Sequence, residues 1–246
     1  MAQNIYDNKD FFEGYAKLNR SVHGLDGAPE WPSIVKMLPK LDGLNIVDLG
    51  CGYGWFCREA RQRGAKNVLG MDISAKMLDK ARDMTDDSFI IYLQEDLEVF
   101  KLQEDTYDLA YSSLTLHYIE NLTSLVETIY QSLKPGGHFV FSAEHPIYTA
   151  PKQPGWLIDK KDGKKSWPVN CYQAEGRRVT NWLAEGVIKQ HRLMATYLNL
   201  LIEKGYVIKH VEEWGPTQKQ ILENPSLDEE KERPMLFLVS AQKSAK

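Results

Sequence analysis

The segment VDLGCGYG, residues 47–54, constrains the fold of this chain more than any other, because it joins an apolar run to a helical pattern through three glycines. Glycines let a backbone turn sharply and approach a ligand closely, since a side chain would collide there. The helix that follows presents free N–H groups and a partial positive charge. Asp72 ends the next apolar run, 22 residues after Gly50, where a doubly wound fold places a carboxylate against ribose hydroxyls. The segment therefore predicts a nucleotide-like ligand site.

Apolar runs alternate with helical patterns through the middle of the chain. This alternation predicts an α/β fold with a doubly wound, seven-stranded sheet and helices on both faces. A hairpin is expected around the turn at 184–186. The expected strands cover residues 44–49, 67–71, 89–93, 107–112, 138–143, 206–214 and 235–241, and the expected helices cover 55–62, 75–83, 122–133 and 193–204.

We expect a single domain over residues 1–246 with four parts. These parts are an N-terminal helical cover (1–40), a cofactor-binding core (41–145), an inserted lid or acceptor region (146–192), and a C-terminal helix with strands (193–246). The insertion is too long for a plain connection. Its five aromatic residues either form the core of a lid or line an acceptor pocket; they are Tyr148, Trp156, Trp167, Tyr172 and Trp182. The mixed charges of Asp228–Arg233 predict a solvated loop.

Composition excludes several classes of protein. Lys and Arg number 30 and Asp and Glu number 34, so the net charge of −4 argues against a nucleic-acid partner. No apolar run approaches the ~20 residues that cross a bilayer, and the opening residues MAQNIYDNKD lack the apolar core of a signal peptide. The three cysteines have no metal-ligand spacing. We therefore expect a cytoplasmic protein with no membrane contact and no metal.

Asp48 points to the chemistry of the ligand, because it lies two residues before the first glycine. Its negative charge would repel a pyrophosphate but suits an ammonium or a sulfonium group. A ribose-bearing cation fits this pattern, and S-adenosylmethionine, with S-adenosylhomocysteine as its product, is such a ligand. An NAD(P)-dependent oxidoreductase shares the strand–glycine–helix start and is the alternative that this pattern leaves open.

Residues 44–143 resemble the class I S-adenosylmethionine-dependent methyltransferases, in particular the small-molecule type with one Rossmann-like domain. The resemblance rests on VDLGCGYG, GMDIS (70–74), QEDLE (94–98), YDLAYSSLTLHYI (107–119) and LKPGG (133–137). It implies a mostly parallel sheet whose last strand is antiparallel, and methyl transfer to a small-molecule acceptor. A non-catalytic module that binds the cofactor is a further alternative, and a monomer or a homodimer is expected.

The resemblance also implies roles for individual residues. Asp72 would bind the ribose hydroxyls, Asp96 the adenine amino group, and the Leu97 N–H a ring nitrogen. Arg20 would meet the cofactor carboxylate, although a solvated surface arginine is an alternative reading. The expected cofactor-binding set is Tyr15, Arg20, Asp48, Gly50, Cys51, Gly52, Asp72, Ile73, Met77, Asp96, Leu97, Ser112 and Ser113.

Three residues are candidates for the acceptor side, where a base is needed only if the nucleophile loses a proton. Glu144 and His145 follow the fifth strand, and His117 follows the fourth; open parallel sheets place their sites at these strand ends. A neutral histidine is well suited to accept a proton near pH 7. The alternatives are that His145 caps local backbone, that Glu144 pairs with a lysine, and that His117 packs on the N-terminal segment.

Overall fold

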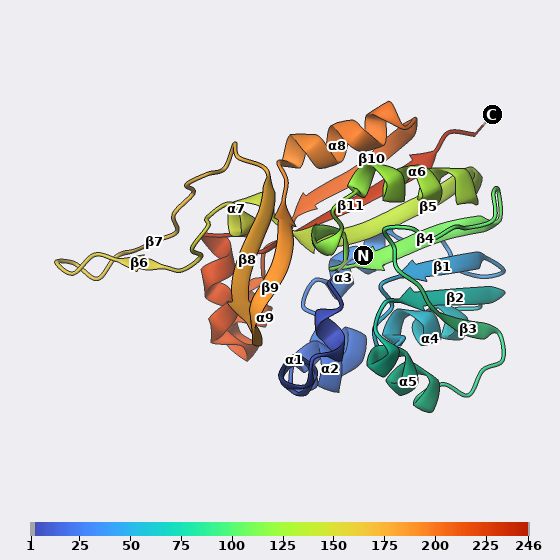
Figure 1. The fold of residues 1–246 in the computed structure, drawn as a ribbon, viewed down its shortest axis with the longest axis horizontal. Helices are drawn as coiled ribbons and strands as arrows, with labels where there is room; N and C mark the ends of the chain where they lie inside the picture. Colours follow the sequence, from blue (N-terminus) through green and yellow to red (C-terminus); the bar gives the residue numbers. More distant parts are fainter. Residues whose placement is uncertain (1–2, 246) are drawn as a thin grey trace.

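A seven-stranded sheet forms the centre of the computed structural model, which describes residues 3–245 (Figure 1). The strand order is β10-β11-β5-β4-β1-β2-β3. Neighbours from β3 to β5 are parallel, whereas β11 is antiparallel to both β5 and β10. This confirms the predicted sheet. The strands are β1 (Asn45–Leu49), β2 (Asn67–Asp72), β3 (Ile90–Gln94), β4 (Tyr107–Ser113), β5 (Leu133–Glu144), β10 (Tyr206–Glu213) and β11 (Leu236–Lys243).

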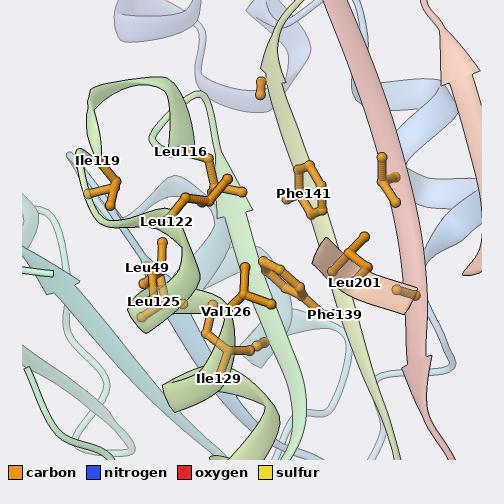
Figure 2. Packing of buried hydrophobic residues seen from close by; sticks show 14 of the residues in the cluster. Leu49, Leu116, Ile119, Leu122, Leu125, Val126, Ile129, Phe139, Phe141 and Leu201 are labelled. Atoms are coloured by element: carbon orange, nitrogen blue, oxygen red, sulfur yellow. The ribbon is translucent and has the colours of Figure 1, made fainter. Parts of the chain in front are cut away.

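Helices cover both faces of the sheet, as predicted. The apolar sides of α6 and α8 pack on one face, where Leu125 and Ile129 of α6 belong to the same buried cluster as Phe139 and Phe141 of β5 (Figure 2). Helices α3, α4 and α5 contribute to the cluster on the opposite face. Ser74 and Asn121 begin α5 and α6 by accepting backbone N–H groups. The helices of the core are α4 (Trp55–Gln62), α5 (Ala75–Asp83), η3 (Leu116–Tyr118), α6 (Leu122–Ser132) and α8 (Met194–Glu203).

Strand β5 starts earlier than predicted. Leu133 pairs with Tyr107 and His138 pairs with Leu109, so residues 134–137 form a bulge within the strand and not a turn before it. The Lys134 ammonium lies 2.8 and 2.9 Å from the two carboxylate oxygens of Asp108, the residue opposite the bulge. The glycines of this segment therefore interrupt the ladder without ending it.

The N-terminal segment is helical over its described part and lies beside the sheet's glycine-loop end. Met1, Ala2 and Lys246, which the predicted domain boundaries include, lie outside the described residues. Residues Gly24–Gly27 form a short 3₁₀ helix. The elements are η1 (Ile5–Asp7), α1 (Lys9–Tyr15), α2 (Asn19–Val22), η2 (Gly24–Gly27) and α3 (Trp31–Met37).

The insertion after β5 forms a short helix and two hairpins. The predicted hairpin is present, but its turn centres on Leu183, whose φ is 61°, because Trp182 pairs directly with Ala184. The hairpin of β6 and β7 projects away from the sheet (Figure 1). The elements are α7 (Pro146–Thr149), β6 (Leu157–Ile158), β7 (Lys165–Ser166), β8 (Gly176–Trp182) and β9 (Ala184–His191).

Three of the five aromatic residues in the insertion gather into one cluster. Tyr148 stacks on Trp167 with ring centroids 5.7 Å apart, and Trp156 meets the edge of Trp167 at 5.5 Å. Trp182 packs against Phe11, so it belongs to a separate cluster. The aromatic residues are thus mainly the core of the insertion.

The prediction of a solvated loop at Asp228–Arg233 is wrong for Glu230 and Arg233, which are buried. The segment continues from α9 (Gln218–Glu223) into η4 (Pro225–Lys231). The Arg233 guanidinium lies 4.8 Å from the Tyr148 ring and 4.6 Å from the Trp167 ring, and pairs with buried Glu230 at 2.8 Å. The charge pattern could not reveal this, because the aromatic partners are far away in the sequence. Arg233 therefore joins the insertion to the C-terminal segment.

We expect Arg233→Ala to lower the free energy of unfolding by about 2–4 kcal/mol, since it removes three cation–π contacts and leaves the Glu230 carboxylate buried without its partner. Denaturant unfolding measures the loss, and limited proteolysis should cut the insertion faster. Lys231→Ala is the matched control, because the Lys231–Asp228 pair is exposed and should contribute little. Equal effects of the two substitutions would contradict this role of Arg233.

Candidate functional site

A cavity of about 1040 Å³ lies at the carboxyl ends of the parallel strands. Its lining includes Asp48, Asp72 and Glu144, which stand in or directly beside β1, β2 and β5. The N-terminal cover contributes Tyr15 and Arg20 to the same lining. Pockets for one small ligand typically occupy ~300–1,000 Å³. The cavity is therefore large enough for two ligands side by side.

The glycine loop adopts a backbone that only glycine takes up easily. The φ angles of Gly50, Gly52 and Gly54 are 77°, 52° and 70°. A Cβ at Gly50 would lie 2.0 Å from the Thr115 Oγ1, whereas one at Gly52 would meet no described atom within 4 Å. The N–H groups of Gly50 and Cys51 both donate to the Met71 carbonyl, at 2.8 and 2.9 Å. These bonds hold the loop against β2.

Asp72 joins this loop to the start of α5. Its Oδ2 accepts the Gly52 N–H at 2.9 Å and its Oδ1 accepts the Ser74 N–H at 2.9 Å. Burial raises the pKa of Asp72 to about 6, although both N–H groups favour the ionised form. Each carboxylate oxygen has a second lone pair. The carboxylate can therefore accept hydroxyl groups from a ligand in the cavity while it holds the loop.

Asp48 places a second carboxyl group in the lining. Burial raises the pKa of Asp48 to about 7 in the ligand-free protein, while the Cys57 thiol donates to its Oδ2 at 3.2 Å. A cation bound beside Asp48 would favour the ionised carboxylate. Burial also raises the pKa of Cys51 to about 11 and that of Cys57 well above its usual value, so neither thiol is a ready nucleophile.

The remaining predicted cofactor residues divide by where their side chains point. Ile73, Met77, Asp96 and Leu97 line the cavity. Ser113 lines it as well, but the described lining does not include Ser112. The predicted contact of Ser112 is corrected by the geometry, since its hydroxyl donates to the Leu49 carbonyl at 2.8 Å inside the sheet. Successive residues of a strand face opposite sides.

Arg20 is not a solvated surface residue. Its Nη2 lies 3.0 and 3.2 Å from the two carboxylate oxygens of Glu30, which is buried. The Glu30 carboxylate and the burial of Arg20 act in opposite directions, and the pKa of Arg20 is raised overall. Because Arg20 lines the cavity, its contact with a cofactor carboxylate stays a prediction, in which Arg20 would be shared with Glu30.

Glu144, the last residue of β5, and His145, the residue after it, have different surroundings. Glu144 lines the cavity, and its carboxylate pairs with the Lys189 ammonium. His145 is absent from the described lining. Its Nδ1 accepts the Ile147 N–H at 3.0 Å, and its Nε2 lies 2.9 Å from Glu213. The candidate role of His145 at the acceptor is therefore corrected: the ring caps α7 and points away from the cavity.

His117 lines the cavity, but it is poorly suited to accept a proton. Its Nδ1 accepts the Glu144 N–H at 3.3 Å, which places the ring proton on Nε2, 4.0 Å from the Glu144 Oε1. Burial lowers the pKa of His117 to about 4, so the ring is neutral at pH 7. The ring therefore orients Glu144.

Four aromatic residues, Tyr6, Tyr118, Tyr148 and Trp182, form one wall of the cavity. Tyr148 and Trp182 are among the aromatic residues of the insertion for which the sequence left a pocket-lining position open, whereas sequence reasoning missed Tyr6 and Tyr118. The hydroxyls of Tyr6 and Tyr118 lie 3.5 Å apart, and Tyr15 meets the edge of Tyr6 with centroids 5.3 Å apart. Burial raises the pKa of all three tyrosines. The only available signal was the position of Tyr118 directly after His117. Lys189 gave none, since it meets Glu144 only through the hairpin.

Residues 3–245 contain no group of three or more His, Cys, Asp or Glu side chains placed to hold a metal ion. None of the helices in that range has the length and apolar character needed to cross a membrane.

Comparison with known proteins gives consistent matches. A family model for a methyltransferase domain matches residues 47–141. A crystal structure of an S-adenosylmethionine-dependent methyltransferase from Mesorhizobium loti is 55% identical, covers 89% of this chain and 100% of that chain, and superposes with a TM-score of 0.86. A second structure, from Listeria monocytogenes and described as the same kind of enzyme, is 39% identical, covers 88% and 99%, and has a TM-score of 0.81.

A further match covers less than half of the chain. A malonyl-[acyl-carrier protein] O-methyltransferase of Pectobacterium atrosepticum is 34% identical over 109 residues. The match covers 44% of this chain and 42% of that relative. The chain therefore matches about two fifths of the length of this relative.

We expect Asp48→Asn to have opposite effects on ligand binding and on stability. In the wild type, affinity for S-adenosylmethionine should rise about tenfold between pH 6 and pH 8, because the cation prefers the ionised carboxylate. The variant should bind more weakly at pH 8 and lose this pH dependence. Isothermal titration calorimetry at several pH values measures both effects.

The ligand-free variant should be more stable by about 1–3 kcal/mol at pH 8. The folded-state pKa of Asp48 lies above its unfolded value, so the cost of the buried charge grows as pH rises from about 4 to about 7 and persists above it. Thermal melts check this sign. A variant that is less stable at pH 8 and binds with unchanged pH dependence would show that Asp48 neither carries a costly buried charge nor contacts the cation.

Proposed function

This chain belongs to the S-adenosylmethionine-dependent methyltransferases, and on that premise we propose that it transfers a methyl group from S-adenosylmethionine to a small-molecule acceptor. The alternative of an NAD(P)-dependent oxidoreductase does not agree with this family. The acidic net charge supports a small molecule over a nucleic acid as acceptor. The proposal includes a cytoplasmic enzyme that acts as a monomer or a homodimer.

The residues around the glycine loop suit each part of the cofactor. Asp72 would accept the ribose hydroxyls, Asp48 would lie near the cationic methionine part, and Arg20 would meet its carboxylate. Asp96 and Leu97 would bind the adenine. When bound, S-adenosylmethionine would supply a methyl group bonded to a sulfonium sulfur, and in-line attack on the methyl carbon would break the carbon–sulfur bond and release the thioether S-adenosylhomocysteine. The chain must therefore align the nucleophile and exclude water.

One observation carries the proposal of catalysis over simple cofactor binding. Glu144 and the aromatic wall line the same cavity as Asp48, Gly50 and Asp72. A second molecule can therefore contact Glu144 while the glycine loop holds the cofactor. Residues of the N-terminal cover, the insertion and α9 line the cavity around these groups, and this supports an acceptor of small size.

Glu144 is the group best placed to bind the nucleophile of the acceptor. Its Oε2 is buried and has no hydrogen-bond partner in the described part of the chain. A hydroxyl or amine on the acceptor would satisfy this oxygen and could pass its proton to the carboxylate. His117 would hold the backbone N–H of Glu144, and the Lys189 ammonium would balance the negative charge. The malonyl-[acyl-carrier protein] relative does not identify the acceptor of this chain, because that match covers only 44% of the chain.

We expect Asp72→Ala to weaken binding of S-adenosylhomocysteine by about 1–3 kcal/mol, the range for ligand hydroxyls left unpaired. Calorimetry on folded protein measures the change. Asp79→Ala is the matched control, because Asp79 is an exposed acid on the neighbouring helix α5 and should bind the ligand normally. The absence of binding by folded wild-type protein would count against the function itself, and an unchanged affinity in Asp72→Ala would remove Asp72 from the site.

We expect Glu144→Gln to reduce methyl transfer about 10²-fold with affinity for S-adenosylhomocysteine within twofold of the wild type. The acceptor is first identified by incubating wild-type protein with methyl-labelled cofactor and a metabolite pool, then isolating the labelled product. His145→Gln is the comparison, since His145 lies outside the cavity lining and should retain most activity. If Glu144→Gln retains full turnover, the carboxylate has no part in the reaction.

A further inference from the structure

A second cavity of about 430 Å³ lies within the insertion, between residues 149–155 and strand β8. Glu144, Tyr148 and Trp182 line both this cavity and the larger one. These three side chains therefore form a shared wall between the proposed methyl-transfer site and a space that the cofactor does not need. The two cavities therefore adjoin at Glu144.

The second cavity carries an excess of positive charge. Three cations, Lys152, Arg178 and Lys189, line it together with the single carboxylate of Glu144. Arg178 is buried, and its guanidinium donates only to backbone carbonyls, including those of Ala150 at 3.0 Å and Ala174 at 2.7 Å. No ion pair joins Arg178 to a carboxylate in residues 3–245. A buried cation of this kind favours an anion nearby.

Two polar atoms of this lining are unpaired. The buried Oγ1 of Thr180 and the buried Oε2 of Glu144 both lack a hydrogen-bond partner among the described residues. Nearly all buried polar groups in native proteins are paired with protein, water or ligand. The Lys189 ammonium has three donors, and Glu144 engages it from one side only. The cavity thus offers hydrogen-bond donors and a hydrogen-bond acceptor to a bound molecule.

Lys189 also decides which charge the acceptor can carry. Its ammonium lies 5.0 Å from the Trp182 ring and 6.0 Å from the Tyr118 ring, and it pairs with Glu144. Aromatic rings and a carboxylate are the groups that would otherwise bind a cationic substrate. Because the Lys189 ammonium already lies beside these rings and Glu144, it would repel a cationic group of an acceptor at this position.

We propose that the second cavity is a subsite for an anionic group of the methyl acceptor, which places its nucleophile at Glu144 and its carboxylate or other anionic group beside Lys189. This inference rests on the proposed function, because it deepens the identity of the acceptor. It assigns the insertion a chemical role in addition to covering the site.

A pair of fluorescent probes that differ in charge tests the subsite. 8-Anilinonaphthalene-1-sulfonate is anionic, and N-phenyl-1-naphthylamine has the same ring system without the sulfonate. Both are titrated into wild-type protein with and without saturating S-adenosylhomocysteine, whose own binding is measured separately by calorimetry. We expect the anionic probe to bind in the presence of S-adenosylhomocysteine, at least tenfold more tightly than the neutral probe.

Variants locate the bound probe. Lys189→Met should weaken the anionic probe about tenfold and leave the neutral probe unchanged, whereas Lys160→Met removes an equal charge from an exposed position of the insertion and should have no effect. Thr180→Leu partly fills the cavity without changing its charge and should also weaken the anionic probe. It keeps the test decisive if Lys189→Met fails to fold.

The proposal is overturned by competitive displacement of the anionic probe by S-adenosylhomocysteine, by equal affinity for the two probes, or by a folded Lys189→Met or Thr180→Leu variant that binds like Lys160→Met. Failure of the proposed function has a different signature, namely no heat of binding with S-adenosylhomocysteine. In that case the difference between the two probes still reports on the charge of the second cavity.

Discussion

The bridge that Asp72 makes between the Gly52 N–H and the Ser74 N–H is the interaction on which the rest of the site depends. It connects the ends of β1 and β2 through one carboxylate and fixes the glycine loop at the start of the cavity. Burial raises the pKa of this carboxyl group and that of Asp48, so the ligand-free protein holds two acids in an environment that disfavours their charge. A cationic, hydroxyl-bearing ligand would stabilise the two negative charges, whereas a phosphate would destabilise them further.

The sheet and the glycine loop beside the cavity could be predicted from the sequence because their signals are local. The helices that begin at Trp55 and Ala75 end where the periodicity of the sequence places their ends. The loop has a positive φ at residues 50, 52 and 54, which glycine adopts more easily than other residues. Ser112 was misassigned because a motif gives the strand but not which face each side chain occupies, and adjacent residues of a strand face opposite ways.

The acceptor side was harder to predict because its contacts join distant parts of the chain. Glu144 and His145 are neighbours at the end of β5, yet one lines the cavity and the other caps α7. Lys189 reaches Glu144 through the β8–β9 hairpin. Arg233 belongs to a mixed-charge run that is typical of a solvated surface, and only the folded insertion brings the rings of Trp156 and Trp167 around it.

The anchoring of the insertion by Arg233 has a consequence for how such an enzyme changes its acceptor. The insertion leaves the sheet after β5 and is clamped from the far end of the chain, by Arg233 on its aromatic rings and by Glu229 on the Trp156 indole N–H at 2.9 Å. Grafting residues 146–192 onto another scaffold without the matching stretch around 229–233 would leave a hydrophobic cluster uncapped. A chimera that exchanges residues 146–192 should therefore also exchange the stretch around 229–233, and the two segments should change together in evolution. Strands β1 and β2 and the glycine loop need not change with them.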